Sequence, residues 1–129
     1  MDCIFCKISE GRIPAVKIWE DERFLAFLDI NPISQGHTLL IPKAHADNVF
    51  DIEDEAYAGL FMAAKMLSKP LKAALGADRI GVIIEGFLVP HAHVHLVPLK
   101  SGGDLSFARA RKAQPAELEG VSEKIRAHL

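Results

Sequence analysis

The sequence predicts an α+β fold with an antiparallel five-stranded meander sheet, one central helix and a C-terminal helix. The predicted elements come in the order strand, strand, strand, helix, strand, strand, helix, which lacks the regular alternation of a doubly wound sheet. The chain has 129 residues, of which 50% are hydrophobic, enough for one sizeable core. We therefore expect a single domain over residues 1–129.

Three strands are expected before the long helix. Residues 15–21 and 23–32 form two short segments with strand character, and the Asn-Pro pair at the end of the second segment closes it. Residues 36–41 are apolar after an initial glycine, and Pro42 ends the run, which indicates a buried strand by its length and its flanks.

The hydrophobic period changes after Asp51, which indicates the central helix. Acidic residues lie at its front and lysines at its back, as the helix dipole favours. We expect Pro70 to kink or briefly break this helix and Gly76 to end it. The apolar residues recur at intervals of three and four: Ala56, Tyr57, Leu60, Phe61, Ala64 and Leu67.

Two more strands and the last helix complete the prediction. Residues 79–86 and 91–99 have strand character and are separated by so few residues that a very short turn should join them. Residues 115–129 form an amphipathic helix, with Pro115 in its first turn, where proline is tolerated best.

Charge and targeting signals exclude several classes of protein. A formal net charge of −2, from 15 basic and 17 acidic side chains, gives no overall positive field for nucleic acid, although a small phosphate ligand remains possible. The N-terminus has no basic region followed by an apolar run, and no stretch approaches the ~20 apolar residues of a membrane span. We expect a cytoplasmic protein that binds no membrane, whose two cysteines are reduced and serve as metal ligands or free thiols.

The segment VPHAHVHLVP, residues 89–98, holds three of the six histidines of the chain. Alternate residues of a strand share a face, so His91, His93 and His95 should line one face. The other face is apolar and should pack on the core, with Ala92, Val94 and Leu96.

A row of three histidines has three possible roles. A solvent-facing polar strand explains one histidine better than three in register. An all-histidine metal site fails because the outer two residues of a straight strand lie about 13 Å apart, too far to meet one zinc. Nucleophilic and acid–base chemistry fits best, because a neutral imidazole is a good nucleophile near pH 7 and its neighbours can donate hydrogen bonds. The middle residue, His93, is then the nucleophile.

These residues carry a family resemblance. HAHVHLV matches the His-φ-His-φ-His-φ-φ signature (φ, apolar) of the histidine triad (HIT) superfamily, and FLDINPISQGHTLLIPKAH closely resembles the segment those proteins carry upstream. The similarity runs from CIFCKI to Pro98, about three quarters of the chain, and is greatest to bacterial members of the Hint branch. Residues 1–100 would hold the core with the motif, and the tail at 101–129 lies where the family varies.

The resemblance implies a HIT-like nucleotide-binding fold, a homodimer that shares one continuous sheet, and an enzyme. Members hydrolyse or transfer nucleoside monophosphates through a nucleotidyl-histidine intermediate. Carried over by position, His93 is the nucleophile, His91 and His95 flank it, and His37 is the fourth active-site histidine. An exposed apolar strand at 81–86 would be a hazardous free edge, which agrees with a dimer.

The resemblance also implies a purine nucleoside pocket. Asp29 matches the ribose-binding position, and an acidic acceptor beside an apolar slot suits a nucleoside. Two alternatives remain open, because Asp29 can form an Asx turn before Asn31-Pro32 and the apolar residues can belong to the core. The positions that match the base-lining residues are Phe5, Ile8, Phe27 and Ile30.

The cysteines indicate a second site. Cys3 and Cys6 have the Cys-x-x-Cys spacing that suits two corners of a zinc tetrahedron, although a pair alone is half a site. In similar bacterial HIT proteins two histidines complete it, at positions matching His45 and His91, so a structural zinc is expected and the chemistry needs no cofactor. A reduced thiol pair without metal is the alternative. A thioredoxin-like redox motif would need a preceding strand, for which the two residues before Cys3 leave no room.

One segment departs from the family pattern. Members place an Asn-x-Gly segment and a loop with Gly-Gln and a hydroxyl residue before the triad, whereas residues 83–90 are IIEGFLVP, with Ile84 at the Asn position and Phe87-Leu88 where Gln and Ser would be. Each lost donor would weaken phosphate stabilisation by roughly 3 to 4 kcal/mol. Candidate substitutes are Lys43, Lys100 and the run 109–112, although that run also suits a solvated patch.

Three functions therefore remain open. The first is a HIT hydrolase or nucleotidyl transferase acting on an adenosine or guanosine 5′-phosphoramidate or a related NMP-X compound. The second is a nucleotide-binding protein of the same fold with little turnover, because the loop at 84–90 lacks the donors. The third is a dinucleoside polyphosphate hydrolase, which the missing loop Gln disfavours. The retained His37, His93, His95 and Asp29 favour the first.

Overall fold

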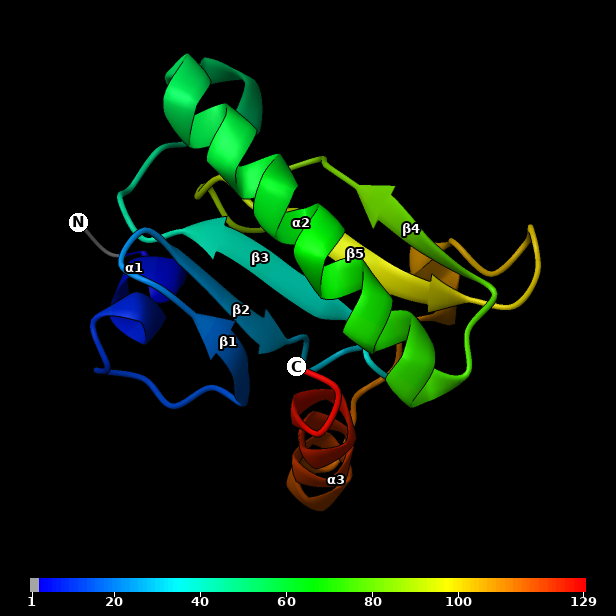
Figure 1. The fold of residues 1–129 in the computed structure, drawn as a ribbon. Coiled ribbons are helices and arrows are strands. Elements are labelled where there is room, and N and C mark those ends of the chain that lie inside the picture. The colour runs from blue at the N-terminus through cyan, green and yellow to red at the C-terminus, as the bar shows by residue number, and fades with distance from the viewer. Residues whose placement is uncertain (1–2) are drawn as a thin grey trace.

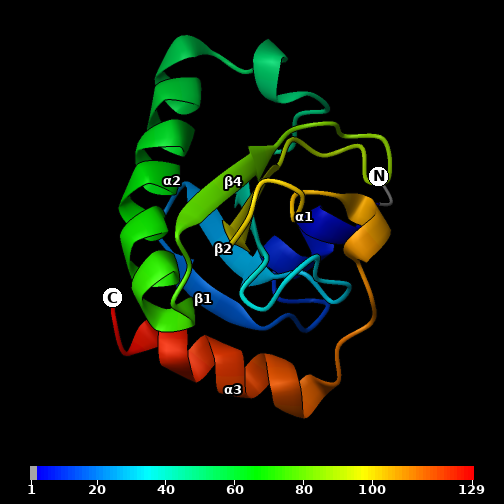
Figure 2. The ribbon, with the colours of Figure 1, turned by 90° about the vertical axis from the view of Figure 1, so that its right-hand side faces the viewer.

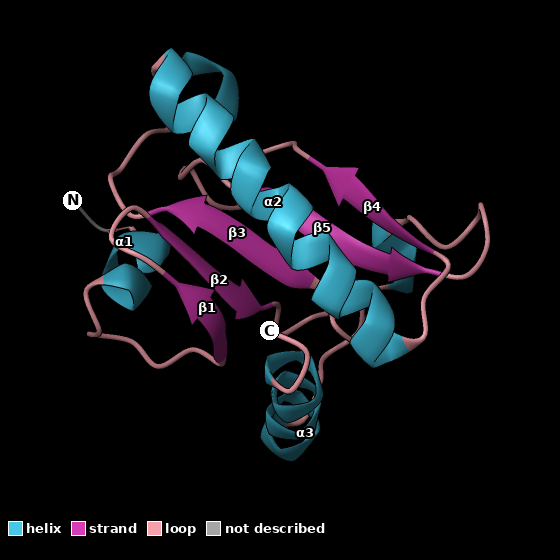
Figure 3. Ribbon diagram, viewed as in Figure 1, coloured by secondary structure: helices cyan, strands magenta, loops and turns pink. Residues whose placement is uncertain are grey.

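A computed structural model describes residues 3–129, and the predicted domain begins two residues earlier, outside the described part. The α+β class is confirmed: one five-stranded antiparallel sheet carries three α-helices and two 3-10 helices (Figures 1 and 3). The strands are β1 (Lys17–Glu20), β2 (Phe24–Leu28), β3 (Thr38–Pro42), β4 (Arg79–Ile83) and β5 (Val94–Leu99). The helices are α1 (Ile4–Ser9), η1 (Val49–Asp51), α2 (Asp54–Leu75), η2 (Phe107–Arg109) and α3 (Pro115–Arg126).

The strand order is β1-β2-β3-β5-β4, so the sheet departs from a simple meander at one point. The first three strands follow one another as predicted. Helix α2 then carries the chain to the outer edge, where β4 lies, and β5 returns between β4 and β3. Strand β5 therefore lies inside the sheet, between two ladders, and β4 is an edge strand.

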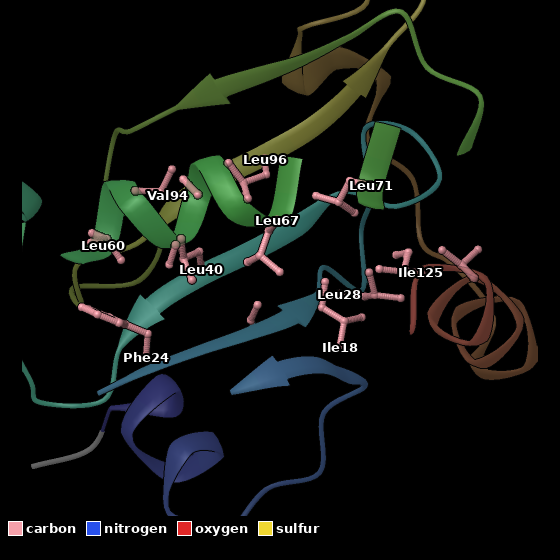
Figure 4. Packing of buried hydrophobic residues seen from close by; sticks show 14 of the residues in the cluster. Ile18, Phe24, Leu28, Leu40, Leu60, Leu67, Leu71, Val94, Leu96 and Ile125 are labelled. Atoms are coloured by element: carbon pink, nitrogen blue, oxygen red, sulfur yellow. The ribbon is translucent and has the colours of Figure 1, made fainter. Parts of the chain in front are cut away.

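Helix α2 covers one face of the sheet and forms the main core with it (Figure 4). Its leucines at 60, 67 and 71 are fully buried, and the labelled side chains point toward Leu40 of β3 and toward Val94 and Leu96 of β5. Burying one such leucine contributes about 1.5–3 kcal/mol. Ala92, Val94 and Leu96 belong to this core, which confirms the prediction for the apolar face of the histidine segment.

The expected break at Pro70 is absent, because α2 runs through it without interruption to Leu75. Pro70 is buried between turns of the helix that are anchored on the sheet by Leu67 and Leu71, and this packing outweighs the one missing backbone hydrogen bond. The helix ends as predicted at Gly76, which adopts a left-handed φ of 63°.

The opposite face of the sheet is covered by α1 and by the segment leading to α3 (Figure 2). Helix α1 was not predicted, because its six residues are too few to show a period. Its Phe5 and Ile8 pack on Phe27, Leu39 and Ile41 in a second, smaller core. Both faces of β2 and β3 are therefore buried, and the candidate site residues lie in this second layer.

The very short turn between the last two strands is a wrong prediction. Ten residues, 84–93, separate β4 from β5, so two of the three histidines precede the strand ladder. The reason lies in the backbone donors: His91 N–H bonds back to the Val89 carbonyl (2.8 Å), and Ala92 N–H bonds to the Ala46 carbonyl (2.6 Å) instead of to β4. Across the described residues, none of the helices is both long and apolar enough to span a membrane.

Candidate functional site

Three histidines of the motif and His37 lie in the second layer, and all four are nearly inaccessible to solvent. The ring centroids of His93 and His95 are 4.9 Å apart, and those of His95 and His37 are 5.1 Å apart. The structure therefore brings together the histidines that the sequence singled out, although only His95 belongs to a strand of the sheet.

The hydrogen bonds of His93 fix its tautomer. Its Nδ1–H donates to the carbonyl oxygen of His91 at 2.6 Å. The proton of a neutral ring then resides on Nδ1, and the lone pair resides on Nε2. This is the form in which an imidazole can attack an electrophile through Nε2.

A chain of hydrogen bonds likewise fixes His95. The backbone N–H of Ile33 donates to Nδ1 of His37 at 2.9 Å, so His37 holds its proton on Nε2. That Nε2 lies 2.9 Å from Nδ1 of His95, to which it donates. His95 therefore carries its proton on Nε2, and this buried donor has no hydrogen-bond partner among the described residues. An unpaired buried donor is costly, and a ligand that accepts from it removes the cost.

Burial keeps both rings of this pair uncharged. It lowers the pKa of His37 to about 3, with a further lowering from His95. Burial also lowers the pKa of His95 to about 4, with a further lowering from His93 and a small opposing effect of Glu85. At neutral pH both rings are hydrogen-bond donors and acceptors without charge.

A cavity of about 320 Å³ opens beside His93 and His95. Its walls are mostly apolar, and Phe5 meets Phe27 edge to face with ring centroids 5.4 Å apart. All five residues expected in the nucleoside pocket line it: Phe5, Ile8, Phe27, Asp29 and Ile30.

Asp29 forms the Asx turn and also lies at the wall of the cavity, while its role toward a ribose stays a prediction. Its Oδ1 accepts from the N–H of Asn31 at 2.8 Å, which is the Asx turn. Its Oδ2 lies 3.5 Å from Nε2 of His37 and its side chain still borders the cavity. Burial raises the pKa of this carboxyl against the lowering effect of the Asn31 hydrogen bond.

The two cysteines meet two histidines at the other end of the row. Sγ of Cys3 lies 3.3 Å from Nδ1 of His91, and Sγ of Cys6 lies 3.3 Å from Nδ1 of His45 and 3.5 Å from Nδ1 of His91. The four ligand atoms are all within 4.8 Å of one another. Cys3 also begins α1, where its sulfur accepts from the N–H of Cys6 at 3.4 Å.

This donor set fits zinc. With Zn–S near 2.3 Å and Zn–N near 2.1 Å, a tetrahedron has sulfur–nitrogen edges of roughly 3.5 Å, close to the separations observed. The Nε2–H of His91 donates to the carbonyl oxygen of Pro42 at 2.8 Å, which orients Nδ1 toward the sulfurs as outer-shell partners of zinc ligands do. Burial lowers the pKa of His91 and so favours the neutral ring that a metal requires.

The basic residues suggested as phosphate ligands do not line the histidine cavity. Lys43 pairs with Glu20 at 2.8 Å, and Arg109 lies 3.8 Å from Asp104. Lys100 lines a separate cavity beyond the end of β5, together with Arg109. The chain after β5 reaches the histidines through Phe107 and not through a basic side chain. The loop at 84–90 contributes Glu85, Leu88 and Val89 to the cavity.

Two residues near the site were missed from the sequence. A carboxylate oxygen of Glu85 lies within 4.8 Å of a ring nitrogen of both His93 and His95. Phe107 of η2 meets His95 edge to face, with ring centroids 5.2 Å apart. Glu85 had a usable signal, since it precedes a glycine directly after a strand. No local pattern could reveal the contact of Phe107, which comes from a distant segment.

Comparisons with known proteins agree with this geometry. The family model described as HIT domain matches residues 10–102. The chain is 36% identical over 138 aligned positions to Protein hit of Bacillus subtilis, covering 99% of this chain and 94% of that protein. It is 42% identical over 103 positions to the adenosine 5′-monophosphoramidase of Schizosaccharomyces pombe, covering 76% and 74%. The crystal structure of a Zn-bound histidine triad family protein from Mycobacterium smegmatis superposes with a TM-score of 0.85 at 36% identity, covering 99% and 93% of the two chains.

Proposed function

This chain belongs to the HIT family. We propose that it hydrolyses purine nucleoside 5′-phosphoramidates or related NMP-X compounds, or transfers their nucleoside monophosphate. The reaction passes through a nucleotidyl-His93 intermediate. One observation carries the proposal. The hydrogen bonds leave a lone pair on Nε2 of His93 and an unpartnered proton on Nε2 of His95, and both rings border the same cavity.

In the first step Nε2 of His93 attacks the α-phosphorus and forms a P–N bond. The bond from phosphorus to the departing amine breaks, and its electron pair leaves with the amine. The new nucleotidyl-imidazolium keeps its Nδ1–H on the carbonyl of His91, which disperses the positive charge that forms. The nucleoside lies in the apolar cavity, with a ribose hydroxyl on Asp29.

His95 stabilises the phosphoryl group with the proton that it presents on Nε2. Its Nδ1 accepts from His37, so the ring stays neutral and donates to a phosphoryl oxygen in both steps. The nitrogen of the phosphoramidate takes up one proton from solvent, and the amine then leaves as a neutral molecule with the electron pair of the P–N bond. In the second step water attacks the phosphorus and releases one proton to solvent, and the P–N bond to His93 breaks with its electron pair on Nε2. Nucleoside monophosphate is released, and His93 returns to its neutral form.

We propose a structural role for zinc at Cys3, Cys6, His45 and His91. Zinc supplies no chemistry to the reaction, because four protein ligands leave no open position for water or substrate. Its role is to hold α1 against the sheet and thereby to place Phe5 in the wall of the cavity. The reduced thiols that this role requires favour the cytoplasm.

We further propose a homodimer through β4. This strand is an edge of the sheet in the described chain, and Val82 on it is 45% exposed. An open apolar edge favours pairing with a second copy. Sedimentation equilibrium should give twice the chain mass for the parent protein and the chain mass for Val82→Lys, and a monomeric parent would contradict the proposal.

Intact mass spectrometry tests the catalytic proposal. The protein is mixed with adenosine 5′-phosphoramidate and quenched in base, which preserves phosphoramidate bonds. We expect one transient adenylyl adduct on the parent and on His128→Ala, which removes an exposed histidine, and no adduct and no product with His93→Ala. Product formation by His93→Ala at the parent's rate would overturn the proposal.

A nucleotide-binding protein with little turnover is the second candidate. The observation that favours it is the loop at 84–90, which offers the cavity a carboxylate and apolar side chains but no hydroxyl or amide side chain. The same experiment separates the two functions. Nucleotide retained by the parent protein without adduct or product would establish the second.

A further inference from the structure

His93 lies between two cavities. The first is the apolar cavity to which the nucleoside is assigned. The second, of about 290 Å³, lies on the side of the segment between β3 and η1. His93 and Glu85 are the two residues that line both. The remaining residues of the second cavity are Asp47, Asn48, Val49, Ile84, Gly86 and Phe87.

The second cavity is acidic. Two carboxylates, those of Asp47 and Glu85, lie in its wall, and no lysine or arginine is among the described residues that line it. The Glu85 carboxylate is fixed by a hydrogen bond from the N–H of Phe87 at 3.2 Å. Phe87 itself is 89% exposed, so the wall on that side is open to a ligand from solvent.

A second observation points to a ligand beside Glu85, on the side of the first cavity, which His95 lines, although His95 is not among the described residues that line the second. His95 is 95% buried, since only 5% of its surface is exposed, and its Nε2 has no hydrogen-bond partner in the described chain. A carboxylate oxygen of Glu85 lies within 4.8 Å of a ring nitrogen of His95 and of His93. A group that accepts from His95 while bonded to a phosphorus on His93 therefore lies next to the Glu85 carboxylate.

We propose, on the basis of the function proposed above, that Glu85 and Asp47 determine the specificity for the departing group, and that the substrate is a nucleoside 5′-phosphoramidate of an amine carrying a second, positively charged group. Carboxylates attract such an ammonium and repel the anionic departing groups of sulfate or polyphosphate compounds. The proposal also gives the short loop a role, because the loop places the carboxylate beside the two histidines.

The positive charge on the departing amine should strengthen substrate binding without changing the rate of the chemical step. The P–N bond breaks and the amine leaves with its electron pair and a proton, but the distal ammonium keeps its charge in the ground state and in the transition state. An interaction that is equal in both states lowers KM and leaves kcat unchanged.

Three adenosine 5′-phosphoramidates of the same length test this. Their amines are 1,5-diaminopentane, hexylamine and 6-aminohexanoate, which end in an ammonium, a methyl and a carboxylate. For the parent protein we expect kcat/KM to fall in that order. Glu85→Gln keeps an acceptor for Phe87 N–H, and it should reduce the ratio of kcat/KM between the ammonium and methyl substrates about fivefold, mainly through KM. Asp47→Asn should reduce it less, and Glu53→Gln, an exposed residue outside both cavities, should not change it.

Affinity measurements keep this inference separate from the catalytic one. The dissociation constants of the three compounds are measured with His93→Ala, with and without Glu85→Gln. Affinities that decrease from the ammonium to the methyl to the carboxylate compound in His93→Ala, and that become similar when Glu85→Gln is added, would support the specificity. This result would hold even if the parent protein shows no turnover. The proposal would be overturned if the ammonium and methyl compounds had equal affinity and equal kcat/KM. It would also be overturned if the ratio of their kcat/KM values stayed the same in Glu85→Gln and in Asp47→Asn. Neither result would contradict the nucleotidyl-His93 adduct.

Discussion

The two outer histidines of the row are chemically identical, equally far from His93 in the sequence and both buried, yet their rings have opposite connections. His91 donates from Nε2 to the Pro42 carbonyl and presents Nδ1 to two sulfurs. His95 accepts at Nδ1 from His37 and presents a proton on Nε2 to the cavity. The partner of one ring nitrogen therefore decides what the other nitrogen can do.

One side chain connects the cysteine end of the row to His93 and to the cavity wall. Phe5 lies between the two cysteines in the sequence, and its ring meets His91 and His93 edge to face, with centroid distances of 5.9 and 5.1 Å. It also packs on Phe27 in the cavity wall. A change at the cysteine end should therefore affect nucleotide binding through Phe5, whereas a change at the His37 end should affect the chemistry and leave the metal in place.

The largest effect is expected from Cys3→Ala. The variant should bind less than a tenth of the zinc of the parent, and its free energy of unfolding should fall by about 4 kcal/mol when free zinc is 1,000 times the parent's Kd. Zinc content is measured by elemental analysis and stability by urea unfolding. His128→Ala serves as the control, and a Cys3→Ala protein that still holds one zinc per chain would show that the site is assigned wrongly.

The next effect is expected from His37→Ala. Loss of the donor to Nδ1 frees His95 to exchange its tautomer, and kcat should fall by about 10²-fold while zinc content stays constant. His37→Gln, whose amide can both donate to His95 and accept from Ile33, should restore part of the activity. The ¹⁵N chemical shifts of His95 report the tautomer directly, and an unchanged tautomer in His37→Ala would refute this role.

The sequence correctly predicted those features that depend on the spacing of neighbouring residues. The alternation of histidines with Ala92, Val94 and Leu96 correctly predicted which side of the segment packs on the core. Spacing could not reveal that the hydrogen bonds from His91 to Val89 and from Ala92 to Ala46 keep the first two histidines out of the ladder. That outcome depends on a backbone partner more than 40 positions away.

The candidate site was likewise predicted only in part. The nucleoside-pocket residues were predicted through the family resemblance, and the structure gathers them around one cavity, but their roles stay predictions. Glu85 and Phe107 were missed, because each gains its meaning only from a histidine that folding brings near it. The hydrogen bond from Ile33 to His37, which fixes the tautomers, involves a backbone donor that no side-chain pattern can indicate.

The stability of the protein should depend on pH through the His37 end of the row. Both His37 and His95 have a lowered pKa in the folded protein, about 3 and about 4. The unfolded chain binds these protons below about pH 6.5, whereas the folded chain does not, so stability falls as the pH falls from 6.5 toward 4. From pH 7 to pH 5 each ring should cost about 2 kcal/mol.

His37→Gln isolates this contribution, because it removes one titrating ring and retains the zinc ligands. Urea unfolding at pH 7 and pH 5, with zinc present, should show a loss of stability about 2 kcal/mol smaller in the variant than in the parent. Equal losses in the two proteins would mean that the acid sensitivity arises elsewhere.

The smallest effect is expected from Phe5→Leu, which tests the link between the cysteine end and the cavity. Leucine keeps most of the apolar volume in the second core but loses the edge-to-face contacts with His91, His93 and Phe27, which are worth about 0.5–1.5 kcal/mol. The Kd for AMP, measured by titration calorimetry, should rise about threefold to fivefold, with one zinc still bound. If the affinity does not change in Phe5→Leu but falls in Cys3→Ala, the cysteine end affects the cavity through the position of α1 as a whole, because the Phe5 ring would then contribute nothing on its own.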